Sequence, residues 1–365
     1  MRRLQAPQNF RNHIGGIPSI GTVKGGEANN GSSLNEVFIL SRTEVAKQMS
    51  SSKSRPPSAP LILDSEDHSL PPTFIKDTFK NFIGHLGYVP PRQLSEPRKT
   101  YQALCSEFRA YDDGGSWFKK MCIEASTMAE LSYPDHPMEV QYQIAKFTWF
   151  LIYVDDLGEK FPSALERFQQ RVLAKEFPTG KFLQDFQEHL TDMYKFWDVV
   201  PANCINLAAM DFINGCLLEG MPVVRDMKMS PNVQSWPYFL RMKTGCASAY
   251  TFMLFPKNAF PDISAYIQVV EDITLFTNLT NDVLSFYKEY VAGETSNYVS
   301  NRAIATQKSL AQALKDTVDD ALAAHDRVTS ALESTDAYKP WKRFVNGYLA
   351  NHFGVKRYRL GDLGF

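Results

Sequence analysis

Three oxygen-bearing side chains recur at four-residue intervals near position 285. Asn281, Ser285 and Glu289 offer an amide oxygen, a hydroxyl and a carboxylate. A helix turns by about 100° per residue, so all three are predicted to lie on one helical face. Hard oxygen donors of this kind suit Mg²⁺. Lys288, next to Glu289, adds a fixed positive charge. A cation and a lysine side by side predict a site for a polyphosphate.

A second group of polar side chains, Asp155, Asp156 and Glu159, follows the apolar run 149–152. Asp155 and Glu159 are four residues apart and are therefore predicted to face the same way. Close carboxylates repel one another unless a cation offsets their charge. The ordinary alternative is a solvated helix end, although acidic residues there oppose the helix dipole. By itself this group leaves a metal site and a solvated helix end both open.

Each group needs a helix to position it. Apolar periodicity predicts one helix over 137–154, which leads into the carboxylates, and another over 262–293, which carries the second donor set. A further helical segment, 231–250, is interrupted near Gly245. Alternating β-branched runs are few, so we expect an all-α fold. Ten or so helices after residue 70, with no linker between them, predict one large bundle.

Composition narrows the class of protein. Of 365 residues, 44% are hydrophobic and 13% aromatic, enough for a large core or an apolar ligand cavity. The net charge of -1 gives no reason to expect nucleic acid or an anionic membrane surface as a partner. No apolar run is long enough to span a bilayer. The five cysteines form no C-x-x-C motif and favour a reduced protein, which we expect in the cytoplasm. Residues 1–65, rich in Gly, Ser, Asn and Pro, predict a disordered extension before a domain over 66–365.

Together the two groups carry a family resemblance. D-D-x-x-E after an aromatic helix, followed by N-D-x-x-S-x-x-K-E, resembles the class I terpene cyclases. The pattern looks most like fungal sesquiterpene cyclases of the trichodiene synthase type, over about residues 70–360. The resemblance implies a single class I terpenoid synthase bundle with an active-site cavity between its helices. It also implies a lyase that ionises a prenyl diphosphate, best matched by farnesyl diphosphate, and cyclises the carbocation to a sesquiterpene hydrocarbon or alcohol. A homodimer is usual in the family.

The resemblance assigns metal ligands for three Mg²⁺ ions. Asp155 would be the main ligand of the first two ions, while Asp156 and Glu159 would orient it or bind through water. Asn281, Ser285 and Glu289 would hold the third ion. Asp282, within the second motif, would either join this set or pair with a nearby Arg or Lys.

The resemblance also assigns contacts to the diphosphate. These would come from Asn281 and Lys288, from Arg241 just before the helix interruption, and from the pair Arg357–Tyr358. Family members often have Asp where Thr244 stands, which puts in doubt a carboxylate link from Arg241 to the helix break. Without the resemblance, Arg241 is equally an ordinary salt-bridge residue, and the basic segment around Arg357 is simply solvated.

Residues deeper on the motif helices are expected to line the cavity. Aromatic faces there would stabilise a carbocation, with ordinary core packing as the alternative for each ring. Thr277 and Asn278 would either orient a water, giving an alcohol, or bond a backbone carbonyl. The substrate-binding candidates are Phe147, Thr148, Leu151, Thr277 and Asn278, with Phe150, Ile152, Tyr153, Phe212, Tyr250, Ile273 and Thr274 as further options.

Two other functions fit parts of the pattern. A chain-elongating prenyltransferase should carry two aspartate-rich motifs, and the sequence has one. A non-catalytic helical protein that binds a phosphorylated ligand needs no metal ligands on facing helices. The D-x-D-D motif of a protonation-type cyclase does not occur.

Overall fold

The computed structural model describes residues 70–91, 99–112 and 114–365, all of which belong to one compact unit. These residues form fourteen α-helices and six 3₁₀ turns and contain no β-strand, which confirms the all-α prediction. The predicted extension, 1–65, lies outside the described residues, so its boundary with the domain stays a prediction.

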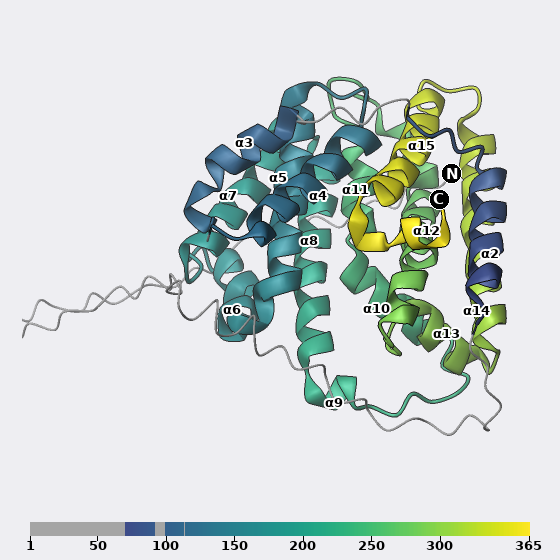
Figure 1. Ribbon diagram of the computed structural model, residues 1–365. Helices are drawn as coiled ribbons and strands as arrows, with labels where there is room; N and C mark the ends of the chain where they lie inside the picture. The colour runs from purple at the N-terminus through teal and green to yellow at the C-terminus, as the bar shows by residue number, and fades with distance from the viewer. Residues whose placement is uncertain (1–69, 92–98, 113) are drawn as a thin grey trace, which may run out of the picture. The chain divides into compact units, whose positions relative to one another are not determined.

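The α-helices, labelled in Figure 1, are in chain order α2 (Pro72–His85), α3 (Lys99–Glu107), α4 (Ser116–Ser132), α5 (Met138–Leu157), α6 (Pro162–Leu173), α7 (Lys181–Phe196), α8 (Val199–Gly220), α9 (Pro222–Arg225), α10 (Ser235–Gly245), α11 (Ala247–Met253), α12 (Val270–Val291), α13 (Tyr298–Thr306), α14 (Leu310–Leu332) and α15 (Tyr338–Gly354). The 3₁₀ turns are η1 (Arg109–Tyr111), η2 (Gly158–Lys160), η3 (Ile263–Ala265), η4 (Ile267–Val269), η5 (Lys356–Tyr358) and η6 (Leu360–Leu363).

Helix α12 lies at the centre of the packing. It contacts α11, α14 and η5, and it also touches α2, α10 and α13 (Figure 1). A helix covered on so many sides must bury polar residues along with its apolar ones, and Asn278, Asp282 and Ser285 are all buried. Buried polar groups require partners, so this helix is suited to hold a polar site inside the bundle.

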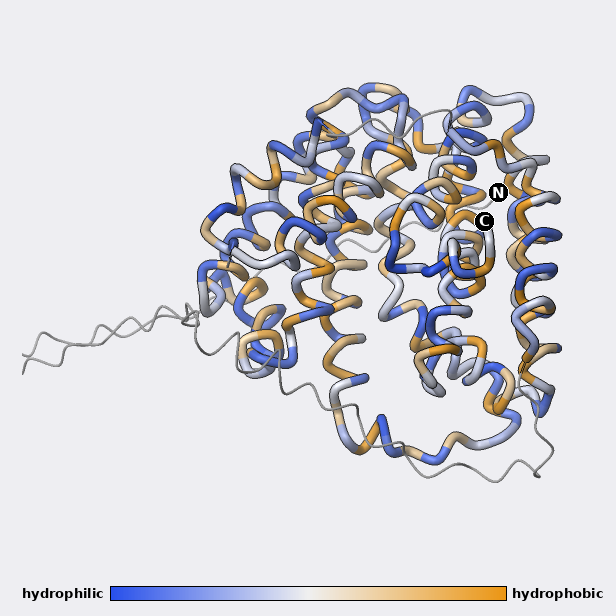
Figure 2. The backbone as a smooth tube through the Cα atoms, viewed as in Figure 1, coloured by the Kyte–Doolittle hydropathy of each residue, from blue (hydrophilic) through white to orange (hydrophobic). Residues whose placement is uncertain are grey.

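Helices α5 and α8 face α12 across the interior. Helix α5 packs against α4, α3, α7 and α8, and an aromatic cluster fixes it there. In this cluster the rings of Phe108 and Trp149 stack at 3.8 Å, and those of Tyr153 and Phe182 at 4.0 Å. Helix α8 is apolar along most of its length (Figure 2), as a helix with neighbours on several sides should be.

One helix boundary differs from the sequence expectation, and one agrees with it. Helix α12 begins at Val270 and not near position 262, because the Asp262 carboxylate accepts the Ser264 N–H and starts a 3₁₀ turn instead. Tyr266, with φ of -141°, then lies outside helical geometry. The interruption expected near Gly245 is confirmed: Cys246 adopts left-handed backbone, with φ of 52°, between α10 and α11.

Helix α15 crosses α4 at Gly347. A Cβ atom at Gly347 would lie 1.7 Å from the Leu131 carbonyl oxygen and 2.5 Å from the Leu131 carbonyl carbon. The two helix backbones are therefore in direct contact, which only glycine permits. After α15 the chain turns through η5, which packs against α12. This crossing sets how far α15 and η5 reach over the interior.

Among the described helices, none combines the length and the apolar character needed to cross a membrane.

Candidate active site

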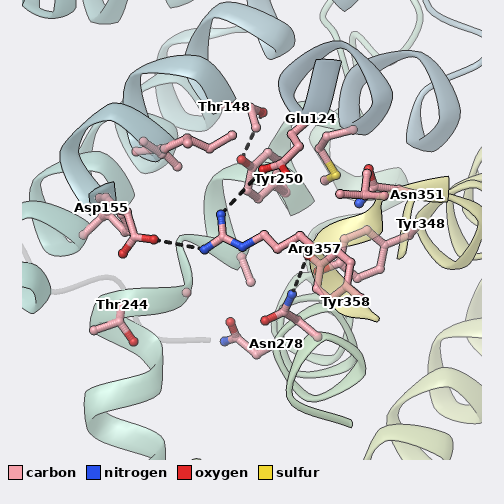
Figure 3. Close-up of a pocket in the computed structure, with 18 of the residues that line it drawn as sticks. Glu124, Thr148, Asp155, Thr244, Tyr250, Asn278, Tyr348, Asn351, Arg357 and Tyr358 are labelled. Carbon is pink, nitrogen blue, oxygen red and sulfur yellow. Dashed lines mark hydrogen bonds and ion pairs between the residues drawn. The ribbon is translucent and has the colours of Figure 1, made fainter. Parts of the chain in front are cut away.

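A cavity of about 210 Å³ opens where α4, α5, α8, α10, α12 and α15 approach one another (Figure 3). Its lining combines charged and amide side chains with apolar and aromatic ones. The charged and amide residues are Glu124, Asp155, Arg241, Asn278, Asn281, Asn351 and Arg357, and the larger apolar and aromatic residues are Met128, Leu151, Ile152, Phe212, Tyr250, Tyr348 and Tyr358. A ligand with one charged part and one hydrocarbon part would match such a lining.

Arg357 extends from η5 into this cavity and bridges two carboxylates on different helices (Figure 3). Its Nη2 lies 3.2 Å from Asp155 Oδ2 on α5, and its Nη1 lies 3.6 Å from Glu124 Oε2 on α4. Burial opposes the charge of Arg357, but Tyr358, Asp155 and Glu124 outweigh it and raise the pKa of Arg357. Burial also opposes the charge of Glu124 and so raises its pKa. This effect is larger than the lowering of the pKa by Arg357 and Lys120. Arg357 therefore remains a cation between the helices.

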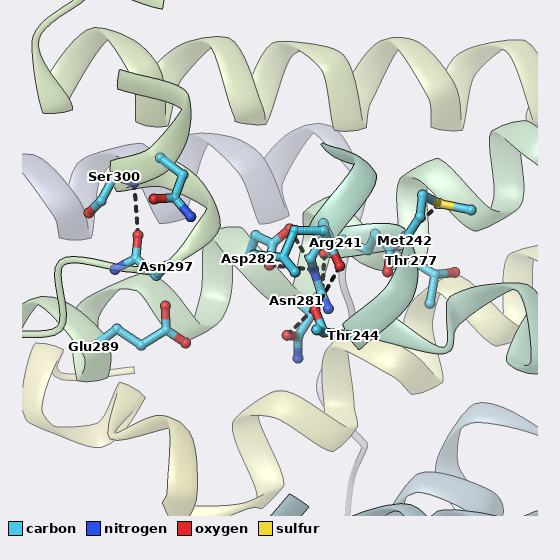
Figure 4. Close-up of polar contacts among 12 residues, drawn as sticks. Arg241, Met242, Thr244, Thr277, Asn281, Asp282, Glu289, Asn297 and Ser300 are labelled. Carbon is cyan, nitrogen blue, oxygen red and sulfur yellow. Dashed lines mark hydrogen bonds and ion pairs between the residues drawn. The ribbon is translucent and has the colours of Figure 1, made fainter. Parts of the chain in front are cut away.

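Arg241 is the second arginine of the cavity and is almost fully enclosed. Its Nε lies 2.7 Å from Asp282 Oδ1, and its Nη2 donates to Asn281 Oδ1 at 3.0 Å and to the Asn278 carbonyl at 3.3 Å (Figure 4). Of the two roles expected for Asp282, metal binding or pairing with a basic residue, the structure contains the pairing, with Arg241. Burial raises the pKa of Asp282 to about 6, outweighing the attraction of Arg241. Polar contacts with these three residues fix the Arg241 guanidinium in one orientation.

The break between α10 and α11 lies directly beside Arg241. A Cβ atom at Gly245 would stand 2.1 Å from Asn278 Oδ1 and 2.6 Å from Arg241 Nη1, so any larger residue would displace these two side chains. The Thr244 hydroxyl donates to the Leu240 carbonyl at 3.2 Å, within its own helix. Thr244 therefore provides no carboxylate link between Arg241 and the helix break. Arg241 contacts the break through the closely packed Gly245 instead.

Asn281 connects α12 to the C-terminal segment. Its Nδ2 lies 3.2 Å from the Tyr358 hydroxyl and 3.2 Å from His352 Nε2. Burial lowers the pKa of His352 to about 4, so this imidazole is neutral near pH 7. The rings of His352 and Tyr358 are 4.4 Å apart. One amide side chain thus contacts Arg241 with its oxygen and Tyr358 with its nitrogen, which joins the two arginine-bearing regions.

The aspartate-rich group is not arranged as expected. Helix α5 ends at Leu157, and Glu159 lies in the 3₁₀ turn beyond it, so the expectation that Asp155 and Glu159 share a helix face is wrong. The backbone leaves helical geometry at Leu157, with φ of -124°, and Gly158 then begins the 3₁₀ turn. Only Asp155 of the three lines the cavity. Asp156 is exposed and accepts the Trp117 indole N–H at 2.8 Å.

The second donor set is spread along α12. Asn281 lines the cavity, whereas Ser285, Lys288 and Glu289 do not. Ser285 is buried one turn further on, and Lys288 forms an ion pair with Glu289 at 3.4 Å. A helix rises 1.5 Å per residue, so Glu289 stands roughly 12 Å along the axis from Asn281. Figure 4 shows Glu289 apart from the cluster of Arg241, Asn281 and Asp282.

The cavity wall matches part of the expectation. Thr148, Leu151 and Asn278 line it, as do Ile152, Phe212 and Tyr250 from the wider set. Phe147 and Thr277 are buried behind the lining: Phe147 packs edge-on against Tyr250 at 6.0 Å, and the Thr277 hydroxyl bonds the Ile273 carbonyl at 2.8 Å. Phe150, Tyr153, Ile273 and Thr274 also lie outside the lining.

Sequence reasoning did not find the contributions of α4 and α15. Glu124 from α4 and Tyr348 and Asn351 from α15 line the cavity without belonging to any motif. The signal for Glu124 was present but weak: it is a carboxylate in a helix whose neighbouring turns are mostly buried, such as Met121 and Met128. No comparable signal marked Asn351.

The donor set of the cavity suits a hard divalent cation. Among the described residues, the buried oxygens Glu124 Oε1, Asn278 Oδ1 and Asn351 Oδ1 have no hydrogen-bond partner, and all three residues line the cavity. Asp155 adds a half-exposed carboxylate. Oxygen atoms of carboxylate and amide groups are the ligands that Mg²⁺ takes, together with water and phosphate. The residues present therefore fit Mg²⁺ bound with a phosphorylated ligand.

Comparison with known proteins identifies the family of the chain. Residues 120–364 match the family model described as trichodiene synthase (TRI5). Terpene synthase BipA of Cochliobolus sativus is 34% identical over 237 residues, covering 64% of this chain and 73% of that protein. Longiborneol synthase CLM1 of Gibberella zeae is 33% identical over 303 residues, covering 80% of this chain and 88% of that protein.

A solved structure shares the fold. The linalool/nerolidol synthase from Streptomyces clavuligerus aligns with a TM-score of 0.52 over 71% of this chain and 96% of its own. The sequence identity is 12%, so this likeness concerns the arrangement of helices alone.

Proposed function

The chain belongs to the trichodiene synthase family of fungal class I terpene synthases, and from this premise we propose that it is a Mg²⁺-dependent sesquiterpene cyclase acting on farnesyl diphosphate. The reaction breaks the allylic carbon–oxygen bond, releases diphosphate and cyclises the carbocation to a sesquiterpene hydrocarbon or alcohol. The observation that carries the proposal is one cavity in which two paired arginines, oxygen donors and aromatic rings lie together.

The charged residues would bind the diphosphate. Arg241 and Arg357 are held in place by carboxylates and are suited to stabilise negative charge that develops on a leaving group, because they need no reorganisation. Tyr358 and Asn281 would add hydrogen bonds. Lys288 stands further along α12 and would reach the diphosphate only by leaving its ion pair with Glu289.

Oxygen donors on α5 and α12 would hold the metal. The terpene synthase family generally uses Mg²⁺, which in this cavity would neutralise the diphosphate as it leaves. Asp155 would have to exchange Arg357 for the ion, and Asn281 would have to release Arg241. Ser285 and Glu289 would complete the set on α12. Asp156 and Glu159 would act through water, and the binding of three ions is part of the proposal.

The apolar part of the lining would enclose the hydrocarbon chain. Phe212, Tyr250 and Tyr348 present aromatic rings, whose faces stabilise a carbocation. The hydroxyl of Tyr250 is bonded to Thr148 Oγ1 at 3.0 Å, and that of Tyr348 to the Thr277 carbonyl at 3.1 Å. Because both hydroxyls donate hydrogen bonds, these two rings are held in fixed orientations.

The alternatives are less well supported. A chain-elongating prenyltransferase would place a second aspartate-rich motif opposite Asp155, where this chain has Asn281 and Ser285. A non-catalytic phosphate-binding protein gives no reason for aromatic rings beside the arginines. The homodimer and the cytoplasmic location implied above stay predictions.

Incubation with each prenyl diphosphate tests the proposal. Purified protein and Mg²⁺ would be supplied separately with geranyl, farnesyl or geranylgeranyl diphosphate, and volatile products analysed by gas chromatography–mass spectrometry. We expect a cyclic C15 product from farnesyl diphosphate, and none after chelation of Mg²⁺. A folded protein that gives no terpene from any of the three substrates would refute the proposal. In a parallel incubation with isopentenyl diphosphate added as the five-carbon donor, a longer linear diphosphate would favour the prenyltransferase.

Replacing Gly245 by alanine should slow the reaction without unfolding the protein. The new methyl group would displace Asn278 and the Arg241 guanidinium, and an error of about 1 Å in such a group can cost roughly 100-fold in rate. We expect kcat to fall by about 10- to 100-fold, measured as product formation at saturating substrate. Gly220→Ala, at the end of α8, is the control, because nothing lies within 4 Å of its new Cβ atom. Equal activity in both variants would contradict the role of the break.

A further inference from the structure

Two histidines and an aspartate meet between α2 and α14, away from the cavity. His85 ends α2, and His325 and Asp326 are neighbours on α14, which lies beside α2 (Figure 1). His85 Nε2 is 3.2 Å from Asp326 Oδ2, and His325 Nδ1 is 2.9 Å from Asp326 Oδ1. One ligand atom from each residue lies within 4.8 Å of the others. None of the three lines the cavity.

These separations are close to those of a metal coordination shell. Zinc binds nitrogen and oxygen at about 2.0–2.1 Å in tetrahedral geometry, which places its ligand atoms roughly 3.3 Å apart. The present separations of 2.9 and 3.2 Å would need only small side-chain movements to match. Two imidazoles and a carboxylate suit a borderline divalent ion and suit Mg²⁺ poorly.

The surroundings orient His325 as a ligand. Its ring is buried between Phe276 and Trp341, each 5.8 Å away. Its Nε2 lies 3.3 Å from Thr329 Oγ1, which also accepts the Trp341 indole N–H at 3.0 Å. Metal at Nδ1 would place the ring proton on Nε2, facing this hydroxyl, as is usual for histidine ligands.

The site is also accessible and suitably charged. His85 and Asp326 have side chains 46% and 56% exposed, so an ion can enter from solvent. Asp326 supplies the only negative charge among the three side chains, so a metal bound here would depend on its carboxylate.

We propose that His85, His325 and Asp326 form a binding site for Zn²⁺ or a similar borderline divalent ion, which fastens α2 to α14. The site would be structural, because its three ligands come from α2 and α14. Neither helix contributes a residue to the cavity lining. It is independent of the proposed reaction and of its Mg²⁺ ions.

A zinc titration of the full chain tests the site. Protein without a polyhistidine tag, freed of metal by chelation, would be titrated calorimetrically with ZnCl₂ in excess Mg²⁺, which occupies oxygen-rich sites. We expect one Zn²⁺ per chain, a raised melting temperature, and visible absorption bands of tetrahedral Co²⁺ when CoCl₂ is used. His85→Gln and Asp326→Asn should each weaken zinc binding by more than about 100-fold, since even outer residues of metal sites are worth 10- to 100-fold.

Asp320→Asn is the matched control. Asp320 is on the same helix, has a 53% exposed side chain and pairs with Arg302, so its loss removes an equal charge outside the site. It should bind zinc like the unaltered chain. Absence of zinc binding in excess Mg²⁺, or equal binding by the His85→Gln variant, would overturn the assignment. Because both replaced side chains are exposed, the variants should fold.

Discussion

Replacing Asn281 and Ser285 together by alanine should remove Mg²⁺-dependent turnover, with kcat/KM falling by about 1,000-fold or more. The substitution deletes two proposed metal ligands, and it also removes the amide that contacts both Arg241 and Tyr358. Loss of a single preorganised donor already costs roughly 100- to 1,000-fold in other enzymes. The measurement is product formation across a Mg²⁺ titration, with circular dichroism to verify folding.

Thr280→Val is the control for this variant. Thr280 lies on the same helix, is fully buried outside the cavity lining, and has a hydroxyl with no hydrogen-bond partner among the described residues. An unpaired buried hydroxyl is unfavourable, so a methyl group of the same shape should leave activity unchanged and stability equal or higher. If the double variant retained turnover within about tenfold of the control, Asn281 and Ser285 would not be metal ligands.

Gly347→Ala should cause the largest loss of stability of any single methyl addition considered. In a free helix this change would favour folding by about 1 kcal/mol. Here the methyl group would lie 1.7 Å from the Leu131 carbonyl oxygen, and both obstructing atoms are backbone, which cannot rotate away. The helices α4 and α15 must separate, so we expect the free energy of unfolding to fall by about 3 kcal/mol or more.

Urea denaturation would measure this effect, with Gly84→Ala as the control. Gly84 is also helical, near the end of α2, and its new Cβ atom would meet nothing within 4 Å. That substitution should be neutral or stabilising by up to about 1 kcal/mol. If the two variants were equally stable, α4 and α15 would not be in backbone contact. Because α15 carries Tyr348 and Asn351, Gly347→Ala should also reduce activity.

Much of the site follows from local sequence, since periodicity determines the face of a helix. The two motifs together correctly predicted that Asp155 and Asn281 would face a common interior. The sequence also predicted the helix break beside Arg241. Depth along the helix is a different quantity. Lys288 is seven residues from Asn281, on almost the same face, but stands roughly 10 Å further along the axis and outside the cavity lining. The spacing of a motif therefore predicts direction better than reach.

Other features depend on contacts between distant segments, which no local pattern specifies. Glu124 lines the cavity because α4 packs against α5 and α15, and Arg357 reaches it because η5 folds back onto α12. Gly158, just beyond the end of α5, lies against Leu165 of α6. From the sequence alone, Glu124 is an ordinary acidic residue, Arg357 is part of a basic tail, and Glu159 is part of a continuing helix. Only the assembled fold distinguishes them.

The pairing of both arginines has a thermodynamic consequence. Arg241 is neutralised by Asp282, and Arg357 is shared by Asp155 and Glu124, so the arginines bring little uncompensated positive charge to an incoming diphosphate. A diphosphate entering alone would meet three carboxylates, and a cation entering alone would meet two guanidinium groups. Each ligand therefore lowers the free energy of binding the other. By linkage the coupling is reciprocal: the factor by which diphosphate tightens metal binding equals the factor by which metal tightens diphosphate binding.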